Sequence, residues 1–315
     1  QSCGLKCGLL GTIVYDDGGA SAPADRTTPE SDEVQRYLRR MIDNGCKACS
    51  MECSSHGIVQ GRINGCLYDG AVFTNLTPEH LDYHGTMESY FEAKAQLFRR
   101  FMKEDGAIAP NVAGEYGRRL AKEFPHAITW ATEGGARLVA SHVETGADGS
   151  RFDLLLDGHR IDYVKIPLTG SYNVENALGA AAVCLASGCD EKKVVEGLRN
   201  MPQVPGRMER LDLENGVCVI IDYAHTADSL SALLQTLKPL TEGRLVSLFG
   251  HGGDRFAGHR PLLGKAAARF ADRIFVTMDN PRTEKPQQIA DRIVEGIKSV
   301  RTDDCWSVDL PRDAA

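Results

Sequence analysis

The amino-acid sequence predicts an α/β protein with two domains, and three observations support this prediction. Short apolar runs alternate with longer stretches of helical periodicity, as expected where strands pack against helices. The 315 residues correspond to about two domains at ~150 residues each. The segment MPQVPGR, at residues 201–207, carries two prolines and a glycine between two such alternations. We therefore place the domains at residues 1–202 and 203–315.

The composition excludes several classes of protein. With 36 basic, 43 acidic and 42% hydrophobic residues, the chain has globular rather than disordered or collagen-like composition. A net charge of −7, with only two Trp, nine Tyr and ten Phe residues, disfavours a surface that holds nucleic acid. No apolar run approaches the ~20 residues that span a bilayer. We expect a cytoplasmic protein without nucleic-acid or membrane partners.

The first domain is expected to mix strands and helices from residue 5 onward. Thr28 before Pro29 is typical of a helix start, with Thr28 as the N-cap and Pro29 in the first turn. Apolar residues at helical spacing then predict a helix that ends at Asn44 and Gly45. The other elements expected here are strands at 5–14, 47–53 and 66–76, helices at 87–102 and 174–187, and short antiparallel strands within 126–168.

The second domain alternates strictly between strands and helices. Strands are expected at 217–224, 244–250 and 273–280, and helices at 229–240, 264–271 and 286–300. This alternation predicts a doubly wound parallel sheet. Residues 310–315 resemble the first turn of a further helix, so that both ends of the chain look truncated.

The ten cysteines are too few for a disulfide scaffold. Cys46, Cys49 and Cys53 lie close together, and the CxxC spacing of the first two also occurs in metal sites. No second CxxC occurs to supply the remaining ligands, and the run alternates as a buried strand does. We interpret these residues as reduced thiols, with a metal site as the alternative.

Polar residues gather after the expected strands, where an open α/β sheet places its ligands. Glu52 is a plausible Mg²⁺ ligand, although a polar loop with a capping serine explains the same residues. The segment 74–85 holds two His, two acidic residues and an Asn, and Lys94 follows on a helix, where a lone lysine is usually a solvated charge. Asp222 and His225, in the turn after a buried strand, suit nucleotide contacts, with helix capping by Asp as the alternative.

A further polar cluster joins the glycine loop 250–255 to the segment 279–282. Glycines let the backbone approach a ligand closely, and arginines bind carboxylates through two parallel hydrogen bonds. Asp279 and Arg282 together would complement an amino acid, whereas salt-bridged surface loops are the simpler interpretation.

Six segments together resemble the Mur ligase family, nearly from end to end, and within it the branch that adds diaminopimelate. They are TNLTPEHLDYHGTMESYFEAKAQLF, MECSSHGIVQGR, GRMERLD, DYAHTADSL, GHGGDRFAGHRPLLG and DNPRTE. The resemblance implies an incomplete ATPase-type central domain with a small antiparallel sheet, followed by an incomplete Rossmann-like C-terminal domain. It also implies an amide ligase of peptidoglycan synthesis that uses ATP and Mg²⁺, expected to be a monomer. The implied substrates are UDP-MurNAc-L-Ala-D-Glu and meso-diaminopimelate.

The resemblance also implies roles for particular residues. Lys94 matches a lysine carbamylated by CO₂, which serves catalysis and Mg²⁺ together with Glu52 and His80. The positions that match UDP-sugar dipeptide contacts are Thr27, Thr28, Ser54, Gln60 and Arg62. The nucleotide-side positions are Asn176, Arg207 and Asp222, and those of the amino-acid pocket are Arg255, Asp279, Asn280 and Arg282.

One departure from the family pattern bears on activity. The family carries a phosphate-binding G-T-N-G-K-T-T loop upstream of the segment that matches residues 4–13, and no such loop occurs in this sequence. We therefore expect the 315-residue chain alone to lack ligase activity, whereas its parent protein has it. The alternatives are a lysine-adding relative, a folylpolyglutamate synthetase, which HLDYHGTMESY and GRMERL disfavour, and a fragment that only binds nucleotide or a partner.

Overall fold

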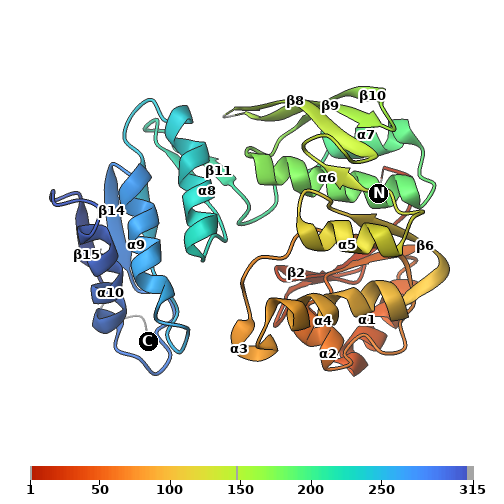
Figure 1. Ribbon diagram of the computed structural model, residues 1–315, viewed down its shortest axis with the longest axis horizontal. Helices are drawn as coiled ribbons and strands as arrows, with labels where there is room; N and C mark the ends of the chain where they lie inside the picture. The colour runs from red at the N-terminus through yellow and green to blue at the C-terminus, as the bar shows by residue number, and fades with distance from the viewer. Residues whose placement is uncertain (1, 147, 311–315) are drawn as a thin grey trace. The chain divides into compact units, whose positions relative to one another are not determined.

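The computed structural model describes residues 2–146 and 148–310, and the chain divides into two compact units, Gln1–Gln203 and Val204–Ala315 (Figure 1). Strands and helices alternate in both units, which confirms the predicted α/β class. The helical turn expected from residue 311 onward lies outside the described residues. No helix among the described residues is long and apolar enough to cross a membrane.

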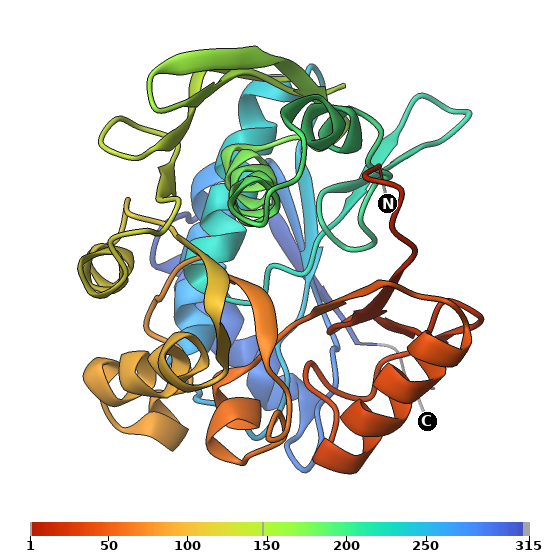
Figure 2. The same cartoon turned by 90° about the vertical axis from the view of Figure 1, so that its right-hand side faces the viewer.

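The first unit begins with a four-stranded sheet in the order β3-β2-β1-β4. Its strands are β1 (Cys7–Leu10), β2 (Val14–Asp16), β3 (Ser21–Pro23) and β4 (Ala48–Met51). Only the β1–β4 pair is parallel. Helix α1 (Ser31–Asp43) lies beside this sheet (Figure 2), and Leu10, Tyr15, Met41 and Cys46 form the buried core of this region.

The start of α1 differs from the prediction. Glu30 is the N-cap residue, and its backbone N–H donates to Glu33 Oε2 at 3.2 Å. Thr28 is fully buried and donates its hydroxyl to the backbone carbonyl of Glu52 at 2.8 Å. The predicted N-cap role of Thr28 is therefore wrong, because its side chain bonds to the residue after β4 instead.

A second layer of the first unit pairs β5 (Tyr68–Phe73) in parallel with β6 (Met102–Pro110). Its helices are α2 (Ser55–Val59), α3 (Leu81–His84), α4 (Met87–Arg100) and α5 (Glu115–Glu123). Phe73, Phe91, Phe98 and Leu120 lie in one buried cluster. Neither β6 nor α5 was predicted from the sequence.

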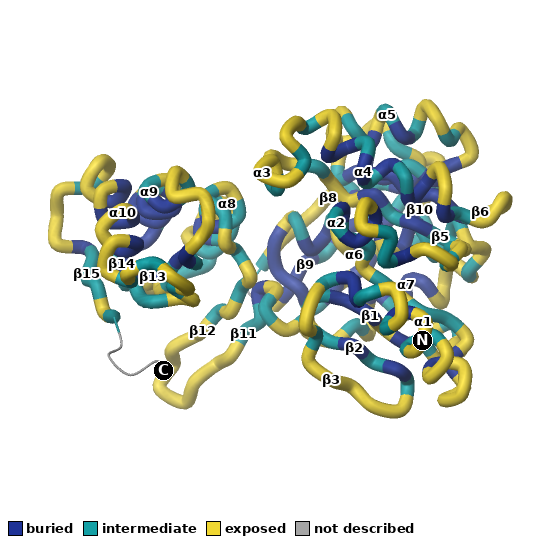
Figure 3. The backbone as a smooth tube through the Cα atoms, turned by 90° about the horizontal axis from the view of Figure 1, so that it is seen from below, coloured by how far each residue is buried: buried dark blue, intermediate teal, exposed yellow. Residues whose placement is uncertain are grey.

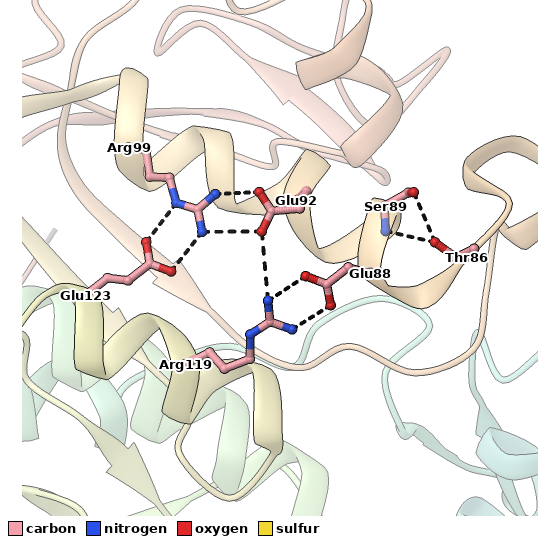
Figure 4. A network of polar contacts seen from close by, with 7 residues as sticks. All are labelled: Thr86, Glu88, Ser89, Glu92, Arg99, Arg119 and Glu123. Carbon is pink, nitrogen blue, oxygen red and sulfur yellow. Dashed lines mark hydrogen bonds and ion pairs between the residues drawn. The ribbon is translucent and has the colours of Figure 1, made fainter.

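Two arginines connect the exposed sides of α4 and α5 (Figure 4). Arg99 bonds to Glu123 at 2.7 Å and to Glu92 at 2.6 Å. Arg119 bonds to Glu88 at 2.6 Å. Each arginine thus bridges carboxylates through several donors, which holds α4 against α5 more firmly than an isolated surface pair would.

The rest of the first unit is a sheet in the order β10-β9-β8-β7 with two helices. Its elements are β7 (Trp130–Ala131), β8 (Leu138–Gly146), β9 (Gly149–Leu156), β10 (His159–Ile166), α6 (Ser171–Ala186) and α7 (Glu191–Arg199). The predicted antiparallel pairing is confirmed for β8, β9 and β10, whereas β7 pairs in parallel with β8. A Cβ on Gly179 would lie 3.1 Å from the Trp130 ring, so the small residue lets α6 approach closely.

The second unit contains a parallel sheet, β13-β14-β15, and a separate hairpin. Its elements are β11 (Glu209–Asp212), β12 (Cys218–Ile221), α8 (Ala227–Leu237), a 3₁₀ helix (Lys238–Leu240), β13 (Val246–Phe249), α9 (His259–Phe270), β14 (Arg273–Thr277), α10 (Pro286–Lys298) and β15 (Trp306–Asp309). The strand predicted at 217–224 was expected in the parallel sheet, but β12 pairs antiparallel with β11.

The core of the second unit lies along α9, α10 and β14, where the buried stretches gather (Figure 3). Leu263, Ile274 and Ile293 are almost completely buried there. Helices α9 and α10 touch backbone to backbone, because a Cβ on Gly296 would lie only 1.9 Å from the carbonyl oxygen of Pro261.

Candidate functional site

Glu52 follows β4 directly and presents an exposed carboxylate. Thr12 Oγ1 donates to Glu52 Oε2 at 2.6 Å. The carboxylate lies against Gly11, since a Cβ there would be 2.8 Å from Glu52 Oε1. Oε1 receives no hydrogen bond from the described residues. One oxygen is therefore fixed by the protein and the other is available to a ligand.

The five residues predicted to contact the UDP-sugar dipeptide lie close to this carboxylate. Thr27 Oγ1 lies 3.0 Å from Thr12 Oγ1, which links it to Glu52. The backbone N–H of Ser54 donates to Thr28 Oγ1 at 2.9 Å, and Ser54 Oγ accepts a hydrogen bond from Gly57 at the start of α2. The loop after β4 is thus tied to the segment before α1.

Arg62 and Gln60 complete this group. Arg62 Nη1 donates to the backbone carbonyl of Thr28 at 3.0 Å, and Nη2 donates to Gln60 Oε1 at 2.6 Å. The Nε atom of Arg62 is buried and finds no hydrogen-bond partner within residues 2–146 and 148–310. An unsatisfied buried donor costs free energy, so this atom marks a place where a ligand oxygen would be favourable. The structure therefore brings all five predicted residues together.

His80 and Lys94 both lie near the Tyr90 ring. His80 precedes α3 in the left-handed backbone region at φ 57°, and its ring centroid lies 6.0 Å from that of Tyr90. Lys94, on α4, places its Nζ 5.3 Å from the centroid of the same ring. The two residues, which are distant in the chain, are therefore neighbours in the fold.

The Lys94 amine has an unusual environment for a lysine. Burial lowers its pKa below the ordinary value, and the Glu79 carboxylate offsets part of this effect. No hydrogen bond or ion pair reaches Lys94 Nζ from the part of the chain that the structure describes. The neutral amine, which is the nucleophilic form, is therefore more populated here than in solvent.

Two histidines for which sequence reasoning gave no role lie in the same place. His84 stacks on Tyr90 with centroids 4.9 Å apart, and its Nε2 lies 2.9 Å from Ser55 Oγ. His56 contacts the His80 ring at 4.9 Å. Burial and neighbouring histidines lower the pKa values of His56 and His84, so both are neutral at pH 7. The sequence could have indicated these two histidines, because they lie in the same motifs as Ser54 and His80.

The cysteines near this site are thiols in protonated form. Burial raises the pKa of Cys49 to about 12 and that of Cys53 to about 11. Cys46 is buried, and all three are free. Among residues 2–146 and 148–310, no group of three or more His, Cys, Asp or Glu side chains is arranged to hold a metal ion.

The predicted nucleotide residues fall in both units. In the second unit, Asp222 accepts hydrogen bonds from the backbone N–H of Met208 at 2.8 Å and of Ala224 at 2.9 Å. This holds Arg207, the residue before Met208, close to the end of β12. Asn176 lies in the first unit, exposed on α6, and its Nδ2 donates to Asn173 Oδ1 at 3.4 Å.

The predicted amino-acid pocket is built from two loops that follow β13 and β14. The backbone N–H of Gly253 donates to the Asn280 carbonyl at 2.8 Å, and a Cβ on Gly253 would lie only 1.8 Å from the carbonyl oxygen of Pro281. The loops therefore touch through their backbones. Arg255, Asp279, Asn280 and Arg282 are all exposed on them.

The turn after β14 precedes α10, which begins at Pro286 as the sequence predicted. In this turn, the Arg282 N–H donates to Asn280 Oδ1 at 3.2 Å, and Arg282 adopts a left-handed backbone at φ 50°. Asn280 thus shapes the turn that presents Arg282.

An ion pair with a buried arginine, which sequence reasoning missed, adjoins these loops. Arg260 is 2% exposed and bonds to both carboxylate oxygens of Glu284, at 2.6 and 2.8 Å. The guanidinium of Arg260, helped by the Asp254 N–H, lowers the pKa of Glu284 to about 2. The available signal was an arginine within an apolar helical pattern, followed by a glutamate just after Arg282.

Comparisons with known proteins match both units to one family. Residues 1–184 match the Mur ligase middle domain, and residues 206–311 match the Mur ligase, glutamate ligase domain. A relative from Streptomyces coelicolor, named UDP-N-acetylmuramoyl-L-alanyl-D-glutamate–2,6-diaminopimelate ligase, is 41% identical over 98% of this chain and 61% of its own length. A relative of the same name from Synechococcus elongatus is 43% identical over 93% of this chain and 59% of its own length. The chain thus spans about three fifths of these curated relatives.

Solved structures agree. A structure with the same ligase name matches with a TM-score of 0.66 and 30% identity, and it covers 97% of this chain and 67% of its own. A folylpolyglutamate synthase from Thermotoga maritima matches with a TM-score of 0.66 at 16% identity, over 99% of this chain and 76% of its own, which indicates a shared fold alone.

Proposed function

The chain belongs to the Mur ligase family, and on that premise we propose that it forms the central and C-terminal parts of a ligase that joins meso-diaminopimelate to UDP-MurNAc-L-Ala-D-Glu at the expense of ATP. The domains would be residues 1–202 and 203–315, and the product would be a cytoplasmic peptidoglycan precursor made by a monomer. The names of the relatives at about 40% identity support the substrates.

The environment of Lys94 carries this proposal. Its half-buried side chain places the amine beside Tyr90, no hydrogen bond or ion pair from the described residues reaches that amine, and its pKa is lowered. Such an amine can attack CO₂, forming a nitrogen–carbon bond and releasing a proton, which converts a cation into a carbamate anion. We expect this carbamate to face the same space as Glu52 and His80.

These three groups fit Mg²⁺ on chemical grounds. Glu52 offers an oxygen that the protein leaves unbonded, a carbamate on Lys94 would add two more, and His80 supplies a nitrogen. Mg²⁺ prefers oxygen ligands and keeps waters and substrate phosphates as the remainder, so few protein ligands suffice. When bound, Mg²⁺ would neutralise phosphate charge during phosphoryl transfer.

The group around Arg62 suits the UDP-linked dipeptide. Its guanidinium is oriented by Thr28 and Gln60, and the unpartnered Nε still has a hydrogen to donate. Carboxylate and phosphate oxygens match an arginine fork closely. We propose that Thr27, Thr28, Ser54, Gln60 and Arg62 position this substrate so that its γ-carboxylate lies at the metal.

We propose nucleotide contacts for Asn176, Arg207 and Asp222, each described within its own unit. Arg207, held near the end of β12 by the Asp222 hydrogen bonds, suits phosphate oxygens, and Asn176 offers an exposed amide. In the proposed reaction, a carboxylate oxygen attacks the γ-phosphorus of ATP and releases ADP. The amine of the second substrate then attacks the acyl carbon, loses a proton and expels phosphate.

The loops after β13 and β14 would bind the incoming amino acid. Arg255 and Arg282 offer two guanidinium groups for carboxylates, and Asp279 offers a carboxylate for an amine. Meso-diaminopimelate has a second carboxylate that lysine lacks, and two arginines match two carboxylates. A lysine-adding ligase is the alternative, in which one arginine would lack a partner.

The test uses the full-length gene product with ATP, Mg²⁺, UDP-MurNAc-L-Ala-D-Glu and either amino acid. We expect ADP release that depends on meso-diaminopimelate, and a product whose mass corresponds to one new amide. Product formation with lysine alone would support the alternative. Absence of product with both amino acids would refute the proposed function.

A further inference from the structure

Two side chains outside the proposed pocket connect the loops that form it. We propose that Arg260 and Glu284 are positioning residues, which hold the loop of Arg255 and the loop of Arg282 in one arrangement and thereby set the affinity for the amino acid. This inference rests on the proposed function, because it concerns the amino-acid side of that reaction.

The geometry of the pair favours a positioning role. Arg260, in the first turn of α9, contacts Glu284 through two nitrogens, and this two-point contact fixes orientation as well as distance. Glu284 Oε1 also accepts a hydrogen bond from the Asp254 N–H at 2.6 Å. One carboxylate therefore joins α9, the glycine loop and the segment after β14.

Among the described residues, one further side-chain hydrogen bond joins the two loops, and it is exposed. Thr283 Oγ1 donates to Asp254 Oδ1 at 2.6 Å, but both residues are exposed, so water competes for these groups. In the described part of the chain, the Arg260–Glu284 pair is the only ion pair between α9 and the segment after β14, and its cation is almost fully buried. Burial shields the Arg260 guanidinium from water, while the Glu284 carboxylate is partly exposed.

Loss of the pair should loosen the amino-acid pocket and leave the other substrates unaffected. Glu284 lies two residues after Arg282 in the chain, so its displacement moves the backbone that presents that arginine. A misplacement of about 1 Å can cost ~100-fold in rate or binding. We expect Glu284→Gln to raise KM for meso-diaminopimelate by about 10- to 100-fold. The KM values for ATP and the UDP-linked dipeptide should change by less than about twofold.

The experiment compares variants of the full-length gene product. Glu284→Gln removes the charge of the carboxylate but keeps its shape. Arg260→Lys keeps the positive charge but loses the two-nitrogen contact, so the two variants test the pair in complementary ways. The double variant Arg260→Glu/Glu284→Arg exchanges the partners. Glu295→Gln is the matched control, because it removes a carboxylate from an exposed pair with Arg292 in α10, at 3.1 Å. KM for all three substrates and Tm are measured for each protein.

Selective loss of amino-acid affinity in both single variants supports the inference, as do partial recovery in the double variant and an unchanged control. A folded Glu284→Gln protein with wild-type KM for the amino acid would overturn it. An equal rise of all three KM values would also overturn it, because a general structural role predicts that result. A wild-type protein that joins neither amino acid would instead refute the proposed function, so the two failures are distinguishable.

Discussion

Replacing Lys94 by methionine should remove most of the activity and leave the fold intact. No hydrogen-bond or ion-pair partner for the Lys94 amine occurs among the described residues, so its removal strands no polar group. Burial lowers the pKa of Lys94, which means that the folded protein holds the cation less favourably than water does. Below the folded-state pKa, the charged amine therefore subtracts from stability. Methionine keeps the apolar stem, so we expect Tm to stay within about 2 °C of the wild type or to rise.

The expected effect on turnover is much larger. If the carbamate completes the metal site, its loss should lower kcat by about 10²- to 10³-fold, as for other groups that stabilise transition-state charge. Amino-acid-dependent ADP release at saturating substrates measures this effect. Lys103→Met is the matched control, because Lys103 is exposed and paired only with Asp69 at 2.5 Å. Acetate or another short carboxylate should partly restore activity to the Lys94 variant by supplying the missing oxygens.

Two outcomes would refute this reasoning. A Lys94→Met protein with near-normal turnover would show that Lys94 is an ordinary helical lysine without a catalytic role. A drop in Tm of more than about 5 °C, together with inactivity, would show that Lys94 stabilises the fold. The pH dependence offers an independent check, because only the neutral amine reacts with CO₂. At limiting bicarbonate, activity should therefore increase as pH rises through the lowered pKa of Lys94.

Three further predictions concern the second unit. Arg282→Ala should reduce kcat/KM for meso-diaminopimelate by ~10³-fold or more, and far more than kcat/KM for lysine, because a site built for a polar group rejects the analogue that lacks it. An unchanged preference between the two amino acids would show that other residues determine the selectivity. Gly296→Ala should cost about 1–3 kcal/mol, measured as the free energy of unfolding in urea, because its Cβ would overlap the Pro261 carbonyl. Gly243→Ala, with open space around it, is the control. Glu284, whose pKa is lowered to about 2, should stabilise the fold above pH ~4.5 and lose this contribution as pH falls towards about 2. In Glu284→Gln, the urea concentration at the unfolding midpoint should therefore depend less on pH over this range.

The sequence predicted the elements wherever a local pattern decides the structure. The helix at 87–102 has its N-cap Thr86 and an apolar face, and α4 begins at Met87. Thr28 shows the limit of such reasoning, because its hydroxyl could cap a helix or bond across the fold to Glu52, and only the tertiary structure decides between them. The pairing of β12 with β11 is similar, since strand periodicity does not specify the partner strand.

The candidate site could be predicted from motifs, but its supporting contacts could not. Glu52, Ser54 and Arg62 lie in one motif, and their proximity to Thr28 required the fold. Arg260 and Glu284 escaped prediction because they lie on different elements, and no local rule marks a pair that forms only when two loops meet. The stacking of His84 on Tyr90 is equally non-local in origin.

The contact between Gly253 and Pro281 limits how this protein could acquire a different amino-acid preference. The main chains of the two loops touch at a point where even a methyl group would not fit. A backbone shift at this point would therefore separate the loops, so it cannot serve to change the width of the pocket. Side chains at positions 255, 279 and 282 project from this junction and are exposed. A different amino-acid preference is therefore most easily reached by substitutions at these three positions. A library of variants restricted to them would leave the backbone of both loops unchanged.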